Sequence, residues 1–589
     1  MCGITGLMTA DGTAPSSLVI DTMLQAIAHR GPDGEGLHAV GGIALAQKRL
    51  AIIDLATGNQ PLFGPGGTAL VANGEIYNYI ELRREPGEYK FTTNSDCELP
   101  LFAYARDGGS FAKHLRGMYG IALDDPHASE LFLSRDPFGI KPLYYMEGPF
   151  GLAFSSEPRA LISAELLLPH VVTSKATELL QLQFTTGAQT VFEHVKRVLP
   201  GETLGVRNGR VQSRTRDPAL PDGAPITIDE DNAVNHLERA LLDSVMVHQR
   251  SDVPYGMFFS GGIDSSALLA CMVRLNESPV RAFTAGFLGT SVHDERSHAR
   301  AVAKAAGAEH IEIEVTAEDF WRELPAIVTA MDDPAADYAM IPTYMLAKAA
   351  SRDLKVVLCG EGGDELFAGY GRYRSAMQPW YLGGRPMRRK GILDGLGVLR
   401  EETGAWRDGI AVAEAEASQA GRTKLQVAQA TDCADWLPHD LLIKLDRCLM
   451  AHSIEGRTPF LDPVVANFAF RLPDELKVHR GMGKYLLRKW LARALPEAKP
   501  FEKKRGFTVP VAEWMSQKAA QLGPLVARSP GVAALCYPQV VQKLFESMED
   551  NKRGGIACWQ LLFYALWHRV HIEGGRSDLP VIEALEGAT

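Results

Sequence analysis

The residues best suited to chemistry lie in the string Phe258-Phe259-Ser260-Gly261-Gly262-Ile263-Asp264-Ser265-Ser266. An apolar run at 253–259 before it predicts a buried strand, and the composition of 267–275 after it predicts a helix. Glycine N–H groups, serine hydroxyls and a helix N-terminus together form a cradle for phosphate. The string lacks the lysine of a Walker loop, and Asp264 would repel phosphate unless a cation such as Mg²⁺ lay between them. A serine-capped glycine turn is the alternative interpretation of S-G-G alone.

A second candidate centre begins at Cys2. Removal of Met1 would make Cys2 the N-terminal residue, and its α-amino group, with a pKa of about 7.7–8.0, could then accept the thiol proton. Asn73-Gly74 follows an apolar run at 70–72. This pair predicts either a hairpin turn or an oxyanion hole built from an amide and a backbone N–H.

Two charged residues complete the N-terminal set. Arg49 can bind a substrate carboxylate bidentately, and Asp96 can bind a substrate ammonium group. Together these two requirements describe a free α-amino acid.

A third candidate is the acidic loop Gly360-Glu361-Gly362-Gly363-Asp364-Glu365, which follows a predicted strand. Such a run is either a solvated turn or a loop that supplies a metal ligand and a base. We favour the second interpretation because loops at the carboxyl ends of strands in one parallel sheet can face one ligand.

The periodicity around these motifs alternates between strand and helix. Strands are expected at 47–54, 253–259, 280–287, 310–315 and 354–359, and helices at 231–247, 294–307 and 341–352. From residue 230 onward this alternation predicts a parallel sheet with ligands at the carboxyl ends of its strands.

The composition excludes several classes of protein. The 589 residues are 46% hydrophobic and 22% charged, with a net charge of −10 spread along the chain, which argues against a nucleic-acid-binding protein. Eight scattered cysteines indicate neither a disulfide framework nor a zinc site. No segment predicts a signal peptide or a membrane helix, so we expect a cytoplasmic protein without a membrane partner.

Known families share these motifs. The phosphate-binding string resembles the pyrophosphate loop of the ATP pyrophosphatase superfamily. Residues 1 to about 200 resemble the class II glutamine amidotransferase domain through M-C-G-I, H-R-G-P-D, R-L-A-I-I-D, N-G-E-I-Y-N, S-D-C-E, R-G-M-Y-G and S-R-D-P-F-G-I-K-P-L-Y-Y. Joined together, the two parts resemble the glutamine-hydrolysing asparagine synthetase family over nearly the whole chain.

This resemblance implies a fold and domain boundaries. We expect α/β and α+β architecture, with an N-terminal nucleophile αββα sandwich followed by a doubly wound parallel-sheet ATP pyrophosphatase domain and a helical C-terminal part. The expected boundaries are 1–216 for the glutaminase domain, 217–229 for a linker, 230–515 for the synthetase domain and 516–589 for its helical extension. A homodimer is a further possibility.

The resemblance also implies roles for individual residues. In the glutaminase domain Cys2 would be the nucleophile, Asn73 and Gly74 the oxyanion hole, and Arg49, Glu75 and Asp96 glutamine ligands together with the oxyanion pair. In the synthetase domain Glu361 would be the base for ammonia, Lys484 would neutralise phosphate charge, and Asp264 and Asp364 would bind Mg²⁺. The expected ligands of ATP or pyrophosphate are Phe258, Phe259, Ser260, Gly261, Gly262, Asp264, Ser265, Ser266, Phe287, Cys359 and Gly360.

The acceptor is the open part of the interpretation. Tyr370 and Arg457, with Asp332, Asp333 or Asp337, are the candidate acceptor ligands. We expect ATP-dependent and glutamine-dependent amidation of L-aspartate through an acyl-adenylate, with release of AMP and pyrophosphate. The alternatives are the same chemistry on a peptide, glycan or natural-product carboxylate, and a non-catalytic homologue with a scaffold role.

Overall fold

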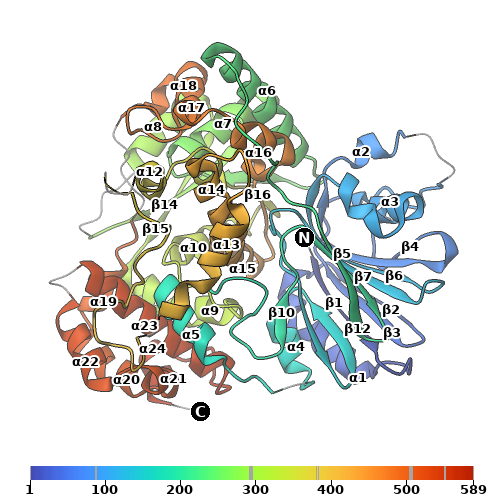
Figure 1. Cartoon of the computed structure of the whole chain (residues 1–589), viewed down its shortest axis with the longest axis horizontal. Helices are drawn as coiled ribbons and strands as arrows, with labels where there is room; N and C mark the ends of the chain where they lie inside the picture. Colours follow the sequence, from blue (N-terminus) through green and yellow to red (C-terminus); the bar gives the residue numbers. More distant parts are fainter. Residues whose placement is uncertain are drawn as a thin grey trace.

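The chain forms two packed parts, an N-terminal pair of sheets and a larger C-terminal part built on a third sheet (Figure 1). The computed structural model describes residues 2–85, 89–166, 168–290, 296–379, 381, 384–402, 404–502, 508–548 and 552–587. This arrangement confirms the predicted fold class.

The N-terminal part is a sandwich of two antiparallel six-stranded sheets. The first contains, in spatial order, β10 (Val195–Arg197), β8 (Tyr144–Gly148), β9 (Gly151–Ser155), β1 (Cys2–Thr9), β3 (Ile43–Arg49) and β2 (Gly34–Val40). The second contains β12 (Arg210–Arg216), β11 (Glu202–Arg207), β7 (Glu130–Arg135), β6 (Gly117–Asp125), β5 (Ala69–Ile76) and β4 (Leu62–Phe63).

Alternating apolar residues bind the two sheets together. Ile4 and Leu45 from the first sheet pack with Val71 and Leu133 from the second. Helices cover the outer faces, with α1 (Ser17–Ala26) and α4 (Pro158–Ser163) on the first sheet and α3 (Leu99–Asp107) on the second. The result is the expected αββα order.

The C-terminal part is built on a five-stranded parallel sheet. Its spatial order is β15 (Glu309–Val315), β14 (Arg281–Phe287), β13 (Tyr255–Phe258), β16 (Val356–Leu358) and β17 (Glu455–Arg457). The chain runs outward from β13 to β15 and then returns to the other side of β13. The topological switch point, where such sheets bind ligands, therefore lies between β13 and β16.

Helices cover both faces of this sheet, as the alternating pattern predicts. One face packs against α6 (Glu230–His248), α7 (Ile263–Leu275) and α8 (Arg296–Ala306), and the other against α9 (Ala317–Ala330), α10 (Met340–Ala350) and α15 (Leu442–Met450). Each predicted strand and helix from residue 230 onward has a counterpart within four residues at either end, although residues 294 and 295 of one predicted helix lie outside the described residues.

The helices after residue 510 surround the long helix α23 (Lys552–His571). They are α19 (Val511–Ser516), α20 (Ala519–Arg528), α21 (Pro530–Leu535), α22 (Pro538–Glu546) and α24 (Val581–Glu586). Trp559 donates its indole N–H to the carbonyl of Ala336 at 2.7 Å, and Trp567 donates to that of Met331 at 2.9 Å. The C-terminal helices thus fix the segment 331–336. Within the described ranges no helix is long and apolar enough to cross a membrane.

The strand expected at 47–54 is wrong beyond Arg49, where β3 ends. Leu50, Ile52 and Ile53 are apolar because they pack with Val247 of the C-terminal part, and they do not serve as a sheet face. The backbone then turns at Asp54, whose φ of 55° lies in the left-handed region. An interface between domains therefore produced the same apolar run as a strand would.

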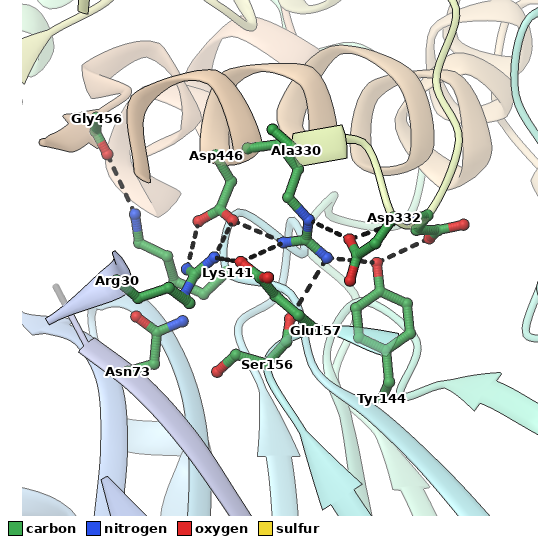
Figure 2. Close-up of polar contacts among 12 residues, drawn as sticks. Arg30, Asn73, Lys141, Tyr144, Ser156, Glu157, Ala330, Asp332, Asp446 and Gly456 are labelled. Carbon is green, nitrogen blue, oxygen red and sulfur yellow. Dashed lines mark hydrogen bonds and ion pairs between the residues drawn. The ribbon is translucent and has the colours of Figure 1, made fainter. Parts of the chain in front are cut away.

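A buried network of charges joins the two parts of the chain (Figure 2). Arg30 donates to both oxygens of Asp446, at 2.8 and 2.9 Å, and to Glu157 at 2.7 Å. Arg447, beside Asp446 on α15, binds Asp332 at 2.7 Å. None of these five side chains is more than 2% exposed. Because buried charges are stable only when paired, this network fixes how the domains meet.

Replacing Asp446 with Asn should destabilise the whole protein, because it leaves the Arg30 and Arg447 guanidinium groups with less negative charge in a buried site. Removing one partner of a buried pair costs about 3–5 kcal/mol, so the first calorimetric transition should fall by several degrees. The control is Glu312→Gln, which breaks a pair with the 63%-exposed Arg300. Such pairs contribute about 1 kcal/mol or less. Equal shifts in the two variants would contradict the role of the network.

Candidate active site

Cys2 begins β1, and one of its candidate partners lies on the facing sheet. The backbone N of Cys2 donates to Oδ1 of Asn73, on β5, at 3.1 Å. The Asn73 side chain is fully buried, and its Nδ2 has no hydrogen-bond partner among the described residues. A buried amide N–H group without a partner is costly unless a ligand accepts from it. The geometry therefore suits a donor to an oxyanion formed near Cys2.

Gly74 lies inside β5, so the hairpin interpretation of Asn73-Gly74 is wrong. A Cβ at position 74 would lie 2.0 Å from the carbonyl oxygen of Met118 on β6. Close strand packing alone therefore requires glycine here.

The other predicted glutamine ligands surround the same end of the sandwich. Arg49 is the register partner of Cys2, and it binds Oδ1 of Asn59 at 2.7 Å and the carbonyl of Asp54 at 2.6 Å. Asp96 accepts from the backbone N of Ile76 at 2.7 Å. The structure thus brings the predicted N-terminal residues together.

Burial controls the proton affinities at this end of the sandwich. It raises the pKa of the Cys2 thiol, so a base is needed to form the thiolate. Burial also raises the pKa of Glu75 well above its usual value, with Glu455 and Asp96 adding to the effect, and it raises the pKa of Asp96 to about 6.

The second candidate site is a cavity of about 400 Å³ at the switch point of the parallel sheet. It lies where the loops after β13 and β16 meet, as the sequence predicts. The predicted residues that line it are Phe258, Phe259, Ser260, Gly262, Asp264, Ser265, Phe287, Cys359, Gly360, Glu361, Asp364 and Tyr370.

The loop after β13 is held by its own hydroxyl groups. Ser260 Oγ accepts from the N–H of Gly262 at 3.2 Å and lies 3.2 Å from Ser265 Oγ. Gly261 and Ser266 do not line the cavity. Ser266 is buried and donates to the carbonyl of Gly261 at 3.3 Å, so it shapes the loop from behind. Gly261 adopts φ 73°, a conformation that favours glycine.

Lys484 forms ion pairs with Asp264 and Asp364, the two predicted metal ligands. Its ammonium group contacts Asp264 and lies 2.6 Å from Asp364. Lys484 has φ 57°, and its N–H donates to the carbonyl of Phe367 at 2.9 Å. A Cβ at Gly369 would lie 1.7 Å from Asp364 Oδ1, so glycine leaves room for this ion pair.

The two carboxylates at this site suit a Mg²⁺ ion that is also bound by substrate phosphates. Mg²⁺ is commonly bound by one or two carboxylates together with substrate phosphates, and Asp264 and Asp364 provide such a pair beside the phosphate-binding loop. Within the described ranges no three His, Cys, Asp or Glu residues form a metal cage. The residues therefore fit a metal that arrives with a nucleotide.

Glu361 lines the cavity close to a lysine that the sequence analysis missed. Burial raises the pKa of Glu361, Asp264 and Asp337 add to the rise, and the Lys444 ammonium opposes it. Lys444, on α15, is itself a lining residue and binds Oδ2 of Asp337 at 2.8 Å. A base with a raised pKa suits proton transfer near neutral pH.

The structure corrects the assignment of Arg457 as an acceptor ligand. Arg457 is fully buried on β17 and does not line the cavity. Its guanidinium binds Glu455 at 2.5 Å, the carbonyls of His248 and Arg250 at 2.8 and 2.7 Å, and lies 3.3 Å from Glu75. Arg457 therefore links the parallel sheet of the C-terminal part to Glu75, at the end of the sandwich that holds Cys2.

Two of the three candidate acidic acceptor ligands are also corrected. Asp332 and Asp333 are at most 1% exposed, and their carboxylates bind Arg447 and Arg197, each at 2.7 Å. Only Asp337, through Lys444, lies next to the cavity.

A sequence signal for the missed residues does exist. Lys444, Asp446 and Arg447 lie on the otherwise apolar helix α15 and are all buried. Three charges within four residues of an apolar helix indicate buried partners or a functional site. Their partners, Arg30 and Asp337, come from distant parts of the sequence.

The comparisons with known proteins agree with this geometry. A family model described as asparagine synthase matches residues 236–569, and one described as a glutamine amidotransferase domain matches residues 1–216. Asparagine synthetase [glutamine-hydrolyzing] 1 of Bacillus subtilis is 34% identical, over 97% of each chain. A putative asparagine synthetase of Mycobacterium tuberculosis is also 34% identical, over 97% of this chain and 98% of its own. Amidase chry2 of Gibberella zeae is 32% identical, over 64% of this chain and 60% of its own.

Gly74→Ala should destabilise the N-terminal sandwich, because the new Cβ would overlap the Met118 carbonyl unless β5 and β6 separated. Overpacking of this kind typically costs about 1–3 kcal/mol. Thermal unfolding of the whole chain measures the effect. The matched control is Gly34→Ala on β2, where the nearest atom is 4.0 Å from the new Cβ. If the two variants melt alike, packing does not explain the glycine at position 74.

Proposed function

Since the chain belongs to the asparagine synthase family, we propose that it uses glutamine and ATP to convert L-aspartate into L-asparagine, with AMP and pyrophosphate as the other products. The observation that carries the proposal is the combination of a Cys2–Asn73 centre and a switch-point cavity, joined by one buried network. The geometry supports a division of labour between the two sites.

In the proposed glutaminase reaction the Cys2 thiolate attacks the side-chain amide of glutamine. The unpartnered Nδ2 of Asn73 and the backbone N–H of Gly74 would stabilise the oxyanion. The proton that the α-amino group of Cys2 takes from the thiol passes to the leaving nitrogen, ammonia departs, and water then hydrolyses the thioester to glutamate and the free thiol. Arg49 and Asp96 would hold the carboxylate and ammonium groups of glutamine, and Glu75, which follows Gly74 on β5, would be a further glutamine ligand.

In the proposed synthetase reaction a carboxylate oxygen of the acceptor attacks the α-phosphorus of ATP, and pyrophosphate leaves. Ammonia then attacks the acyl carbon, Glu361 takes a proton from the nitrogen, and AMP leaves. The loop after β13 would hold the phosphates, and Lys484 would offset their charge. When bound, Mg²⁺ would neutralise phosphate charge beside Asp264 and Asp364.

Lys444 is the residue best placed to bind a carboxylate of the acceptor. Lys444 lines the cavity together with Glu361, and its ammonium group lies 2.8 Å from Asp337 Oδ2. Tyr370 lines the same cavity and donates to Glu365 at 2.8 Å. Aspartate carries one ammonium and two carboxylate groups, so this mixture of cationic and anionic side chains supports it as the acceptor.

A different carboxylate acceptor remains the second candidate, because a relative that carries the name amidase chry2 is 32% identical over 64% of this chain. A scaffold without activity is a weaker alternative, since Cys2, Asp264, Glu361 and Lys484 are all retained.

Cys2→Ala should abolish product formation from glutamine and leave product formation from added ammonium salt, because Cys2 lies in a different domain from the ATP cavity. The measurement is asparagine formed with each nitrogen source. Cys97→Ala, which removes another buried thiol near the same end of the sandwich, is the control. Equal loss with both nitrogen sources would contradict a role restricted to ammonia supply.

Purified protein with ATP, Mg²⁺, glutamine and aspartate should form equimolar asparagine, AMP and pyrophosphate. Amino-acid analysis and chromatography of the nucleotide measure the products. ADP as the main nucleotide would mean that the loop after β13 does not act on the α-phosphate. Turnover only with another carboxylate would exclude aspartate and leave the two-site mechanism intact.

Lys444→Gln should raise the KM for the acceptor by about 10–100-fold, because a charge-assisted hydrogen bond contributes about 1.5–3 kcal/mol. Glutaminase activity and the KM for ATP should stay close to those of the unmodified protein, and Lys444→Arg should recover part of the loss. Lys348→Gln, which removes a 46%-exposed lysine from α10, is the control. A change confined to ATP affinity would contradict acceptor binding by Lys444.

A further inference from the structure

A second cavity, also of about 400 Å³, lies outside the catalytic site, and its lining is strongly basic. It is formed by α12 (Gly371–Met377) and residues 385–390. The lining residues are Arg372, Ser375, Arg385, Pro386, Arg388, Arg389 and Lys390. They include five cations and no carboxylate, and none of them lines the catalytic cavity. A volume of this size suits a small molecule.

Two of these cations extend inward and lie next to the same carboxylate. Arg372 binds Oδ2 of Asp432 at 2.8 Å, and Arg388 lies 3.8 Å from the other oxygen of Asp432. Both guanidinium groups also pack on Trp436, at 5.1 and 3.9 Å from its ring centroid. One carboxylate therefore pairs with two partly buried guanidinium groups. The buried Asp440 carboxyl group also acts on both, but burial raises its pKa well above the usual value, so net positive charge remains.

Arg388 is the least satisfied member of the set. Its Nε and Nη2 atoms are buried and make no hydrogen bond within the described part of the chain. Burial lowers the pKa of Arg388, Asp432 opposes this effect, and Arg372 reinforces it. The backbone of Arg388 adopts φ 48°, which is uncommon outside glycine. Unused N–H donors on a positively charged group are what an oxyanion would satisfy.

The loop that carries these residues is anchored to the protein. Met387 is 3% exposed, and its N–H donates to Glu414 Oε1 at 2.9 Å. Its carbonyl accepts from Arg407 at 2.8 Å. The N–H of Arg385 donates to the carbonyl of Ser375 at 3.3 Å. These contacts hold the walls of the cavity in place before any ligand binds.

We propose that this basic cavity binds a small molecule carrying two or more oxyanion groups, carboxylate or phosphate. Guanidinium groups bind both kinds of oxyanion bidentately, and five cations around one cavity favour a multiply charged ligand. The volume of the cavity suits a small ligand. The net charge of −10 on the whole chain does not favour a large polyanion such as a nucleic acid. The site does not depend on the function proposed for the catalytic cavity.

The site adjoins the catalytic cavity through one side chain. The Arg372 guanidinium lies 3.8 Å from the centroid of the Tyr370 ring, and Tyr370 lines the catalytic cavity. Asp432, the shared counter-charge, begins a π-helical stretch, Asp432–Leu441, whose last residue also lines the catalytic cavity. π-helical stretches occur frequently at functional sites. A bound anion would therefore contact an arginine that packs on a catalytic-cavity residue.

The experiment is calorimetric titration of the full chain, without Mg²⁺ or nucleotide, with citrate in one arm and inorganic tripolyphosphate in the other. The test variant is Arg385→Gln/Arg389→Gln/Lys390→Gln, which changes only exposed side chains of the lining. The control is Lys113→Gln/Lys304→Gln/Lys543→Gln, which removes the same charge at exposed positions outside the cavity.

At least one probe should bind the unmodified chain at one site per chain, and the test variant should weaken that binding at least tenfold while the control leaves it within twofold. Loss of citrate binding identifies a carboxylate site, and loss of tripolyphosphate binding identifies a phosphate site. Equal weakening in the two variants would mean a general charge effect and would overturn the proposal. Binding of neither probe, or binding that the test variant leaves unchanged, would also overturn it.

Discussion

The pairing of buried charges between the two domains is the constraint on which the rest of the structure depends. Arg30 is fully buried, and its Nε donates to the carbonyl of Cys2 at 3.2 Å while its other nitrogens bind Glu157 and Asp446. An isolated buried guanidinium is prohibitively costly, so the domains must meet where both carboxylates reach it. These contacts fix the position of Cys2, the first residue of β1, relative to helix α15.

Helix α15 also supplies part of the lining of the catalytic cavity. Asp446 faces Arg30 and the N-terminal domain, whereas Lys444 and Leu445, on the preceding part of the same helix, line the cavity at the switch point. Arg457 makes a second connection, from β17 of the synthetase sheet to Glu75 beside the Cys2 centre. Helix α15 and strand β17 of the C-terminal part therefore each contact a residue near the Cys2 end of the N-terminal sandwich.

The local features could be predicted from the sequence, since they depend on patterns within a few residues. The strand, glycine turn and helix around Ser260 lie as expected, because the apolar run and the glycines alone specify them. The Cys2–Asn73 pairing joins residues 71 positions apart, and the resemblance to a known family supplied it. Arg30–Asp446 spans 416 positions, and neither source predicted it.

The incorrect assignments share one physical cause. Arg457, Asp332 and Asp333 have the charges that an amino-acid ligand would need, and a sequence does not reveal whether such charges are already paired inside the protein. Their partners, Glu455, Arg447 and Arg197, take up that charge. Leu50, Ile52 and Ile53 illustrate the same limit for apolar residues, because burial between domains and burial within a sheet select the same side chains.

The two cavities of the C-terminal part also differ in the charge of the side chains that line them. Asp264, Glu361, Asp364 and Glu365 line the catalytic cavity, whereas the neighbouring basic cavity is lined by five cations. Asp440 belongs to the π-helical stretch Asp432–Leu441. It is fully buried, burial raises its pKa well above the usual value, and Lys444, Arg388 and Arg372 oppose the rise. Lys444 lines the catalytic cavity, and Arg388 and Arg372 line the basic cavity. Cations from the walls of both cavities thus act on one buried carboxyl group.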